Sequence, residues 1–220
     1  MRKLFFYTLL CNSLYLISCD QTTRLEHDKE ATASTSDLHK ALPDQQLKEE
    51  HDAVGLKVHD SLKAYAEKLK QEELTIDPDH NFTVLMAAHH EGALQLSKEL
   101  EAHAKDDRLR EIIKTVVATK DSESAQLRAF ASEHIPVKGD TTSTKSFMKP
   151  VNRMGQAVPA NANESADIQL AKLLLHHHQT GLELIEVELK LGRNPQVREM
   201  AQQIKTEQVK GIDLIESWLR

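Results

Sequence analysis

Cysteine, glycine, proline and aromatic residues are all scarce in this chain of 220 residues. The only two cysteines, Cys11 and Cys19, lie near the N-terminus, so the rest of the chain has no disulfide and no thiolate for a metal. Seven glycines and six prolines, with abundant alanine, leucine, glutamate and lysine, are typical of an all-α protein. A net charge of −6, an aromatic content of 4% and the lack of a basic stripe argue against a nucleic-acid partner.

The N-terminal residues have the pattern of an export signal. Residues 1–3 carry two positive charges, and residues 4–17 form an uncharged, apolar run too short to span a bilayer comfortably. The run ends in the sequence LISC at residues 16–19, which resembles the lipobox of bacterial lipoproteins. This resemblance implies a lipoprotein signal peptide at 1–18, lipidation of Cys19 and a lipid anchor on the periplasmic face of the inner or outer membrane. An ordinary cleaved signal with a chance cysteine is the alternative.

The composition changes after the signal. Residues 19–43 are rich in threonine, serine and charged residues without an apolar period, which predicts a flexible tether. From 44 to 74, apolar residues recur at helical spacings and predict one N-terminal helix that packs outside a bundle or caps it. We expect the helical domain to extend over 44–220.

Most of that domain is a duplication with an offset of 88 residues. Segment 79–130 aligns without a gap with segment 167–218, and each copy reads as two helices joined by a tight turn. We therefore predict repeat one at 79–134, repeat two at 165–220, and a long crossover linker at 135–164 that is rich in proline, glycine, threonine and serine. Since one hairpin alone has too little core, the two hairpins should form a four-helix bundle with helices at 79–105, 107–133, 165–192 and 194–219.

Two histidine doublets occupy equivalent positions in the two repeats. Apolar residues at alternating steps of four and three place His89 and His177 inward, with His90 and His178 at the edge of the same seam. Counting along the helices on either side of the first turn places Glu123 in the layer of His89. Imidazoles and a carboxylate that converge from facing helices are how bundles build metal sites, so these five residues are the predicted ligands. The alternative is a buried histidine that hydrogen-bonds a carboxylate or a carbonyl group and binds no ion.

The doublets also carry a family resemblance. The pattern Asp-x-x-Phe-x-x-x-Met-x-x-His-His-x-x-Ala, which begins here at Asp79, resembles the domain of unknown function family 305. The resemblance implies a ferritin-like bundle, export and, in some members, copper binding. It also shows departures, because Leu96 and Leu184 stand where the family commonly has methionine, and Gly211 stands where it has glutamate. With so few soft ligands, an imidazole and carboxylate site suits Cu²⁺ or Zn²⁺ better than copper(I).

Catalytic patterns are missing from this sequence. No Glu-x-x-His pair occurs on the seams, which argues against a di-iron oxidase, and no nucleophile motif is recognisable, so we lean towards a non-enzymatic function. Two functions stay open. The first is an envelope lipoprotein that binds copper or zinc through its inward histidines. The second is a metal-free structural or protein-interaction lipoprotein. In both, the lipid anchor ties the protein to a membrane, and the sequence indicates no particular protein partner.

Overall fold

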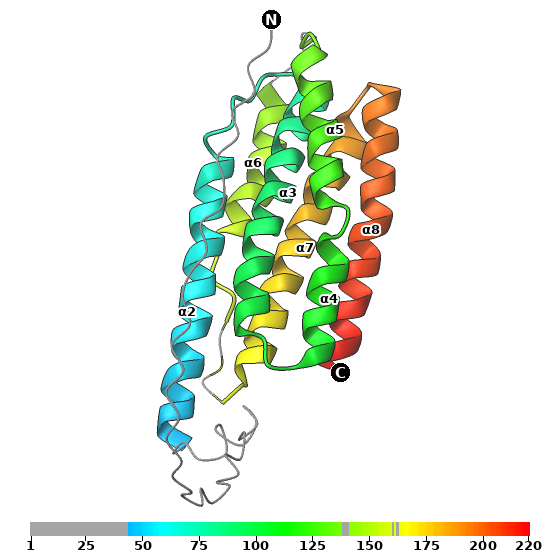
Figure 1. The fold of residues 1–220 in the computed structure, drawn as a ribbon. Coiled ribbons are helices and arrows are strands. Elements are labelled where there is room, and N and C mark those ends of the chain that lie inside the picture. Colours follow the sequence, from blue (N-terminus) through cyan, green and yellow to red (C-terminus); the bar gives the residue numbers. More distant parts are fainter. Residues whose placement is uncertain (1–43, 138–140, 160, 162) are drawn as a thin grey trace, which may run out of the picture. The chain divides into compact units, whose positions relative to one another are not determined.

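The computed structural model describes residues 44–137, 141–159, 161 and 163–220. Every regular element in these ranges is a helix (Figure 1), so the predicted all-α fold is confirmed. The predicted signal peptide, Cys19 and the tether lie outside the described residues. Among the described helices, none is long and apolar enough to cross a membrane.

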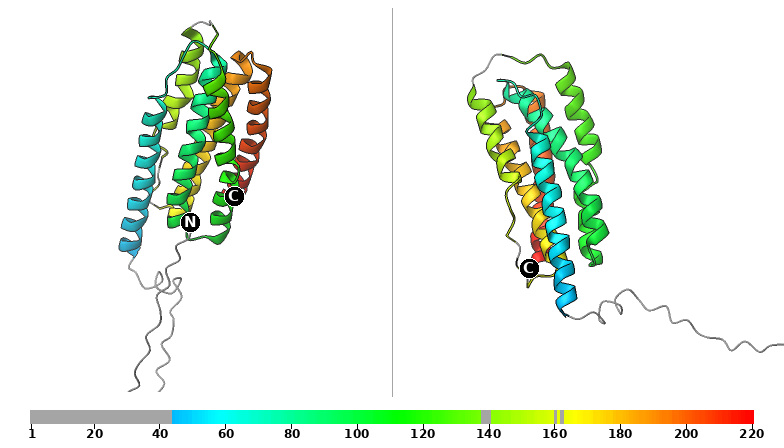
Figure 2. Two further views of the ribbon diagram at one scale, coloured as in Figure 1. Left: turned by 45° about the horizontal axis from the view of Figure 1, so that its top comes forward. Right: turned by 90° about the vertical axis from the view of Figure 1, so that its left-hand side faces the viewer.

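The helices form three layers, of which the middle one is a central pair. That pair is α3 and α7, which pack against each other; α4 with α5 and then α8 form the layer on one side, and α2 and α6 cover the other side (Figures 1 and 2). The bounds are α2 (Asp44–Leu69), α3 (Pro78–His103), α4 (Asp107–Val117), α5 (Lys120–Glu133), α6 (Thr141–Met154), α7 (Ala166–Leu191) and α8 (Pro195–Leu219).

The ends of the bundle helices are set by local signals. Asp77 caps α3 by accepting a hydrogen bond from the N–H of Asp79, and Pro78 occupies the first turn, where a missing N–H costs nothing. Asn194 and Pro195 begin α8 in the same way. The ends predicted from the sequence for the bundle helices agree with the structure within two residues, apart from the break described below.

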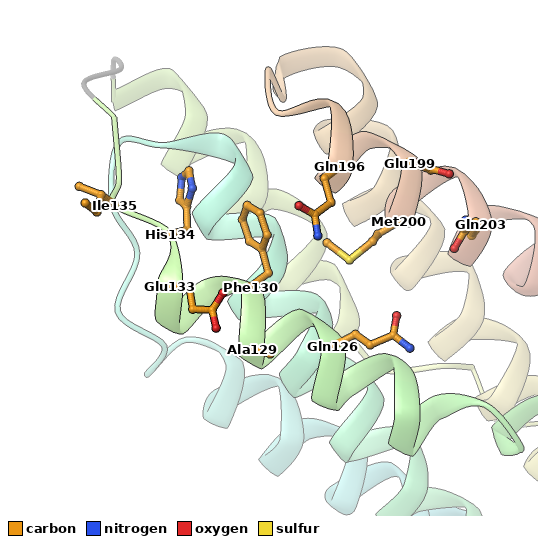
Figure 3. A pocket seen from close by; sticks show the side chains of 10 residues that line it. All are labelled: Gln126, Ala129, Phe130, Glu133, His134, Ile135, Gln196, Glu199, Met200 and Gln203. Carbon is orange, nitrogen blue, oxygen red and sulfur yellow. The ribbon is translucent and has the colours of Figure 1, made fainter.

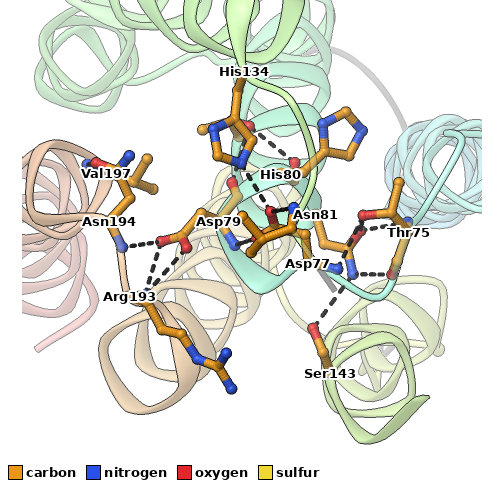
Figure 4. Close-up of polar contacts among 12 residues, drawn as sticks. Thr75, Asp77, Asp79, His80, Asn81, His134, Ser143, Arg193, Asn194 and Val197 are labelled. Atoms are coloured by element: carbon orange, nitrogen blue, oxygen red, sulfur yellow. Dashed lines mark hydrogen bonds and ion pairs between the residues drawn. The ribbon is translucent and has the colours of Figure 1, made fainter. Parts of the chain in front are cut away.

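Two aspartates, 88 residues apart, hold the central pair together at both ends. Asp79, in the first turn of α3, accepts hydrogen bonds of 2.9–3.1 Å from the backbone N–H groups of Arg193 and Asn194 after α7 (Figure 4). Asp167, in the first turn of α7, accepts two hydrogen bonds of 2.8 and 3.1 Å from the turn after α3. The start of each helix therefore lies at the end of the other, so α3 and α7 are antiparallel. We call these two contacts the aspartate clasps.

The segment that we expected to be a linker contains a helix, so that part of the prediction is wrong. Helix α6 buries Phe147, Val151 and Met154 at spacings of four and three, and it packs mainly against α7. This packing maintains the helix although Pro150 lies within it, because burial of an apolar stripe outweighs local propensity. Helix α6 precedes α7 as α2 precedes α3, so each repeat contributes a covering helix and a hairpin.

Two of the expected helices also differ in extent. The return helix of repeat one, expected over 107–133, is broken between Val117 and Lys120 into α4 and α5. At the break the N–H of Ala118 bonds the carbonyl of Thr115, three residues back instead of four. Beyond it the chain keeps α3 as a partner but leaves α8, because α4 packs against both α3 and α8 whereas α5 packs against α3 alone to a comparable extent. Helix α2 ends at Leu69 and not at residue 74.

Candidate functional site

The two histidine doublets meet at the centre of the bundle. Each doublet occupies the middle turns of its helix, and α3 and α7 each have 26 residues, so the middle of one helix lies against the middle of the other. The imidazole rings of His89 and His177 stack, with centroids 4.1 Å apart and planes inclined by 14°. His90 and His178 stand edge-on to their neighbours, and all four side chains are buried. We call these four residues the histidine cluster.

Glu123, the predicted carboxylate, reaches the edge of this cluster. Its Oε2 atom lies 2.8 Å from Nε2 of His90 and 2.9 Å from Nζ of Lys120, a buried lysine one turn earlier. Burial alone would raise the pKa of Glu123, but hydrogen bonds from His90 and Thr119 and the charge of Lys120 lower it to about 2. The carboxylate is therefore ionised throughout the physiological range.

The imidazoles are neutral at neutral pH. Burial lowers the pKa of His89 and His177 well below 6.5, and neighbouring imidazoles lower both further. Burial lowers the pKa of His178 to about 4, and it also lowers the pKa of His90. Neutral imidazole is the form that ligates a metal ion.

Several ring nitrogens of the cluster are buried without a hydrogen-bond partner among the described residues. They are Nδ1 of His89, Nδ1 of His90 and both nitrogens of His177. By contrast, Nδ1 of His178 lies 2.9 Å from the carbonyl oxygen of Leu174. A buried polar atom without a partner costs about 1–3 kcal/mol. Neutral imidazole nitrogens beside one carboxylate are donors that suit Cu²⁺ or Zn²⁺, so the chemistry of these residues fits such an ion.

The rings are not arranged around a common point. Nitrogen lone pairs lie in the ring plane, so stacked rings direct them along nearly parallel planes. In the part of the chain that the structure describes, no three histidine, cysteine, aspartate or glutamate side chains are placed as a ready set of metal ligands. Ligation of one ion by this cluster therefore requires the His89 and His177 rings to turn.

Two glycines of repeat two make room for the cluster. A Cβ atom at Gly181 would lie 2.7 Å from the His89 ring, and one at Gly211 would lie 2.9 Å from the ring of His178. Both positions lie inside helices, where glycine is unfavourable relative to alanine by roughly 1 kcal/mol. Sequence reasoning missed these two roles, although a glycine in the middle of an otherwise regular helix was a usable signal.

Helix α2 covers the histidine cluster on the side of the central pair away from α8. The ring centroid of Tyr65 lies 5.9 Å from that of His177 and 6.3 Å from that of His89, and its hydroxyl donates to the carbonyl of Ala88 at 2.8 Å. Gly92 leaves the space that this ring fills. Tyr65 is one of the apolar residues whose helical spacing over 44–74 predicted this helix. The spacing did not indicate which other helices these residues would contact.

The comparisons with known proteins agree with the duplication. A family model described as domain of unknown function (DUF305) matches residues 19–131 and 133–219, one stretch for each repeat with its covering helix. No curated protein matches. Among solved structures, this chain is similar to the crystal structure of a DUF305 fragment from Deinococcus radiodurans, with 20% identity and a TM-score of 0.47. The similarity covers 64% of this chain and 95% of the other.

Proposed function

Since the chain belongs to the DUF305 family, we propose that it binds a divalent copper or zinc ion through the histidine cluster. One observation carries the proposal: buried, neutral imidazoles from equivalent turns of α3 and α7 retain ring nitrogens without a hydrogen-bond partner among the described residues. A bound ion would supply a partner for the unprotonated nitrogen of each ring that ligates it.

The residues that would hold the ion have different roles. His89 and His177 face each other between α3 and α7, and either nitrogen of the neutral His177 ring can be the ligating one, depending on which of the two carries the proton. His90 and His178 flank them, and Glu123 supplies a negative charge that offsets part of the charge of the ion. Lys120 opposes this, because its ammonium group already pairs with Glu123. Since the imidazoles are neutral, binding at neutral pH displaces no proton from them.

The N-terminal sequence supports a location for this activity. The lipobox-like sequence that ends in Cys19 supports a lipoprotein exported to the cell envelope, with the bundle tied to a membrane by lipid. A protein in that position would bind its ion outside the cytoplasm. We propose no catalytic reaction for the site.

A metal-free role is the second candidate, and one observation favours it. Lys120 already provides a cation for Glu123, and the His89 and His177 rings stack on each other at the centre of the bundle. On this alternative the cluster is a polar core layer of a structural or protein-interaction lipoprotein.

Calorimetric titration of the detergent-solubilised full chain with Cu²⁺ and with Zn²⁺ separates the two candidates. We expect one tight site per chain, lost in His89→Gln/His177→Gln and retained in the control His59→Gln/His103→Gln, whose histidines lie outside the cluster. Circular dichroism establishes that both variants keep their helix content. Weak binding that His89→Gln/His177→Gln leaves unchanged would assign the ions to surface histidines and favour the metal-free role.

A further inference from the structure

A surface groove runs between α5 and α8. Its upper part is a cavity of about 710 Å³ with Phe130 and Ile135 on one side and Gln196 on the other (Figure 3). Its lower part is a cavity of about 270 Å³ that reaches Glu123. The two cavities adjoin each other, since Gln126, Met200 and Gln203 line both.

The break in the return helix explains the groove. Helix α4 packs against both α3 and α8, whereas α5 packs against α3 and makes no comparable contact with α8, so the upper half of α8 has α7 but not the return helix beside it. The groove therefore exists only in the half of the bundle that holds α5 and the upper turns of α8.

Glu123 connects the groove to the histidine cluster. It lines the lower cavity, and its side chain is 17% exposed, whereas that of His90, only 2.8 Å away, is fully buried. The carboxylate thus has one side in the groove and the other at the cluster. Of the five ligands predicted from the sequence, Glu123 is the one that lines the groove.

The approach from α2 is different, because the carboxylate that lines it, Glu99, accepts a hydrogen bond from Ser61 at 2.7 Å and a tyrosine ring lies before the cluster. A cavity of about 250 Å³ between α2 and α3 ends at Tyr65, whose ring covers His89 and His177. The phenol hydroxyl of this tyrosine donates to the carbonyl of Ala88, so the residue presents a hydrocarbon ring to anything that approaches along this side.

We propose that divalent cations reach the histidine cluster through the α5–α8 groove, with Met200 between its two cavities and Glu123 as the residue that passes the ion to His90. This inference rests on the proposed function. Glu133 and Glu199 line the groove and attract cations to it, as does Glu207, whose charge is partly offset by Lys210 at 2.8 Å. The Met200 thioether and the glutamine amides add weak ligands. His134 also lines the groove, but its Nε2 atom lies 2.8 Å from Asp77 and is not free to relay an ion.

Stopped-flow measurement of Cu²⁺ and Zn²⁺ binding to the full chain tests the route, with Gln203→Trp and Met200→Trp as blocking variants. Gln203 is exposed, so its replacement leaves the core intact. A blocked route slows association and dissociation by the same factor and leaves Kd unchanged. We expect both rate constants to fall at least tenfold in each variant, and neither to change in the control Met148→Trp, which lies on α6 away from the groove.

A second pair of variants tests the electrostatic part of the route. Glu199→Lys/Glu207→Lys should lower the association rate constant by about tenfold at low ionic strength and by less at high salt. Absence of binding in the unmodified protein would refute the proposed function itself. Binding at unchanged rates in Gln203→Trp and Met200→Trp would leave the proposed function standing and overturn the route.

Discussion

The two repeats follow one plan but differ on the side of the cluster that faces the return helices. Repeat one places Lys120 and Glu123 there, and repeat two has Gln208 and Gly211 at the positions 88 residues further on. As a result, His90 has a carboxylate 2.8 Å away, whereas the His178 ring packs against the backbone of a glycine. The duplication therefore yields one charged half and one neutral half, and a single bound ion would have its carboxylate on one side only.

The two repeats also differ at a buried position next to the aspartate clasp of Asp79. Leu100, a buried core residue of repeat one, corresponds to Glu188 in repeat two, which is buried to the same extent. Burial and the neighbouring Asp79 carboxylate raise the pKa of Glu188 to about 9. An acid that stays protonated at neutral pH thus occupies a position that takes a leucine in the other repeat.

The largest expected effect comes from replacing Glu188 by leucine, the residue that repeat one has at the equivalent position. Because Glu188 has a higher pKa in the folded than in the unfolded state, its contribution to stability is greatest below pH 4.5 and falls as the pH rises towards 9. Between pH 4.5 and 7 the loss is about 3 kcal/mol. Glu188→Leu should therefore stabilise the protein at neutral pH, and its advantage over the original chain should grow between pH 5 and 9.

Chemical denaturation across this pH range measures that advantage. Glu188→Gln is the control, because it removes the titration but keeps a polar group. A difference between Glu188→Leu and the original chain that stays constant from pH 5 to 9 would show that the Glu188 carboxyl is ionised in the folded state.

An intermediate effect is expected from adding a side chain at Gly211 in repeat two. Gly211→Ala gains helix propensity, but its Cβ atom would meet the His178 ring at 2.9 Å and Val116 at 3.3 Å. We expect a net loss of about 2 kcal/mol of stability. In a His178→Ala background the same change should be neutral or stabilising, so a double-mutant cycle by thermal unfolding checks the cause. Equal losses in both backgrounds would place the clash elsewhere.

The smallest effect comes from making the charged half resemble the neutral one. Lys120→Gln reproduces the residue of repeat two and removes the cation that competes with a metal ion for Glu123. We expect the affinity for Cu²⁺ to rise about tenfold, which corresponds to ~1.4 kcal/mol. Calorimetric titration beside Lys114→Gln, an exposed lysine on α4, provides the comparison. An unchanged or weaker affinity would mean that Lys120 does not oppose the ion.

The sequence was informative about the central layer because its signals are local. Heptad spacing and the offset of 88 residues put each doublet at the middle of a helix, and antiparallel pairing of equal helices then brings the middles together. Counting residues from the turn also brought Glu123 to the correct depth, where it contacts His90. These inferences needed only helix geometry and a short turn.

The features that the sequence did not reveal depend on tertiary contacts. Helix α6 forms because it packs against α7 and buries Phe147 and Val151. This burial outweighs the turn-forming composition around Pro150. Neither glycine nor proline marks the break between α4 and α5, so no residue type signalled it. The approach of Tyr65 to the cluster required knowledge of where α2 docks.

The aspartate clasps also have a mechanical consequence for the histidine cluster. They lie at opposite ends of α3 and α7, which are each about 39 Å long. A slide of α3 along α7 by one residue, ~1.5 Å, would change both clasps in the same way, because each joins the start of one helix to the turn after the other. In one direction the hydrogen bonds of both aspartates would be stretched beyond their range, and in the other both aspartates would be pressed against the turns they cap. Shear in either direction is therefore opposed. The cluster can respond to an ion by rotating its rings, but its two halves keep their longitudinal alignment.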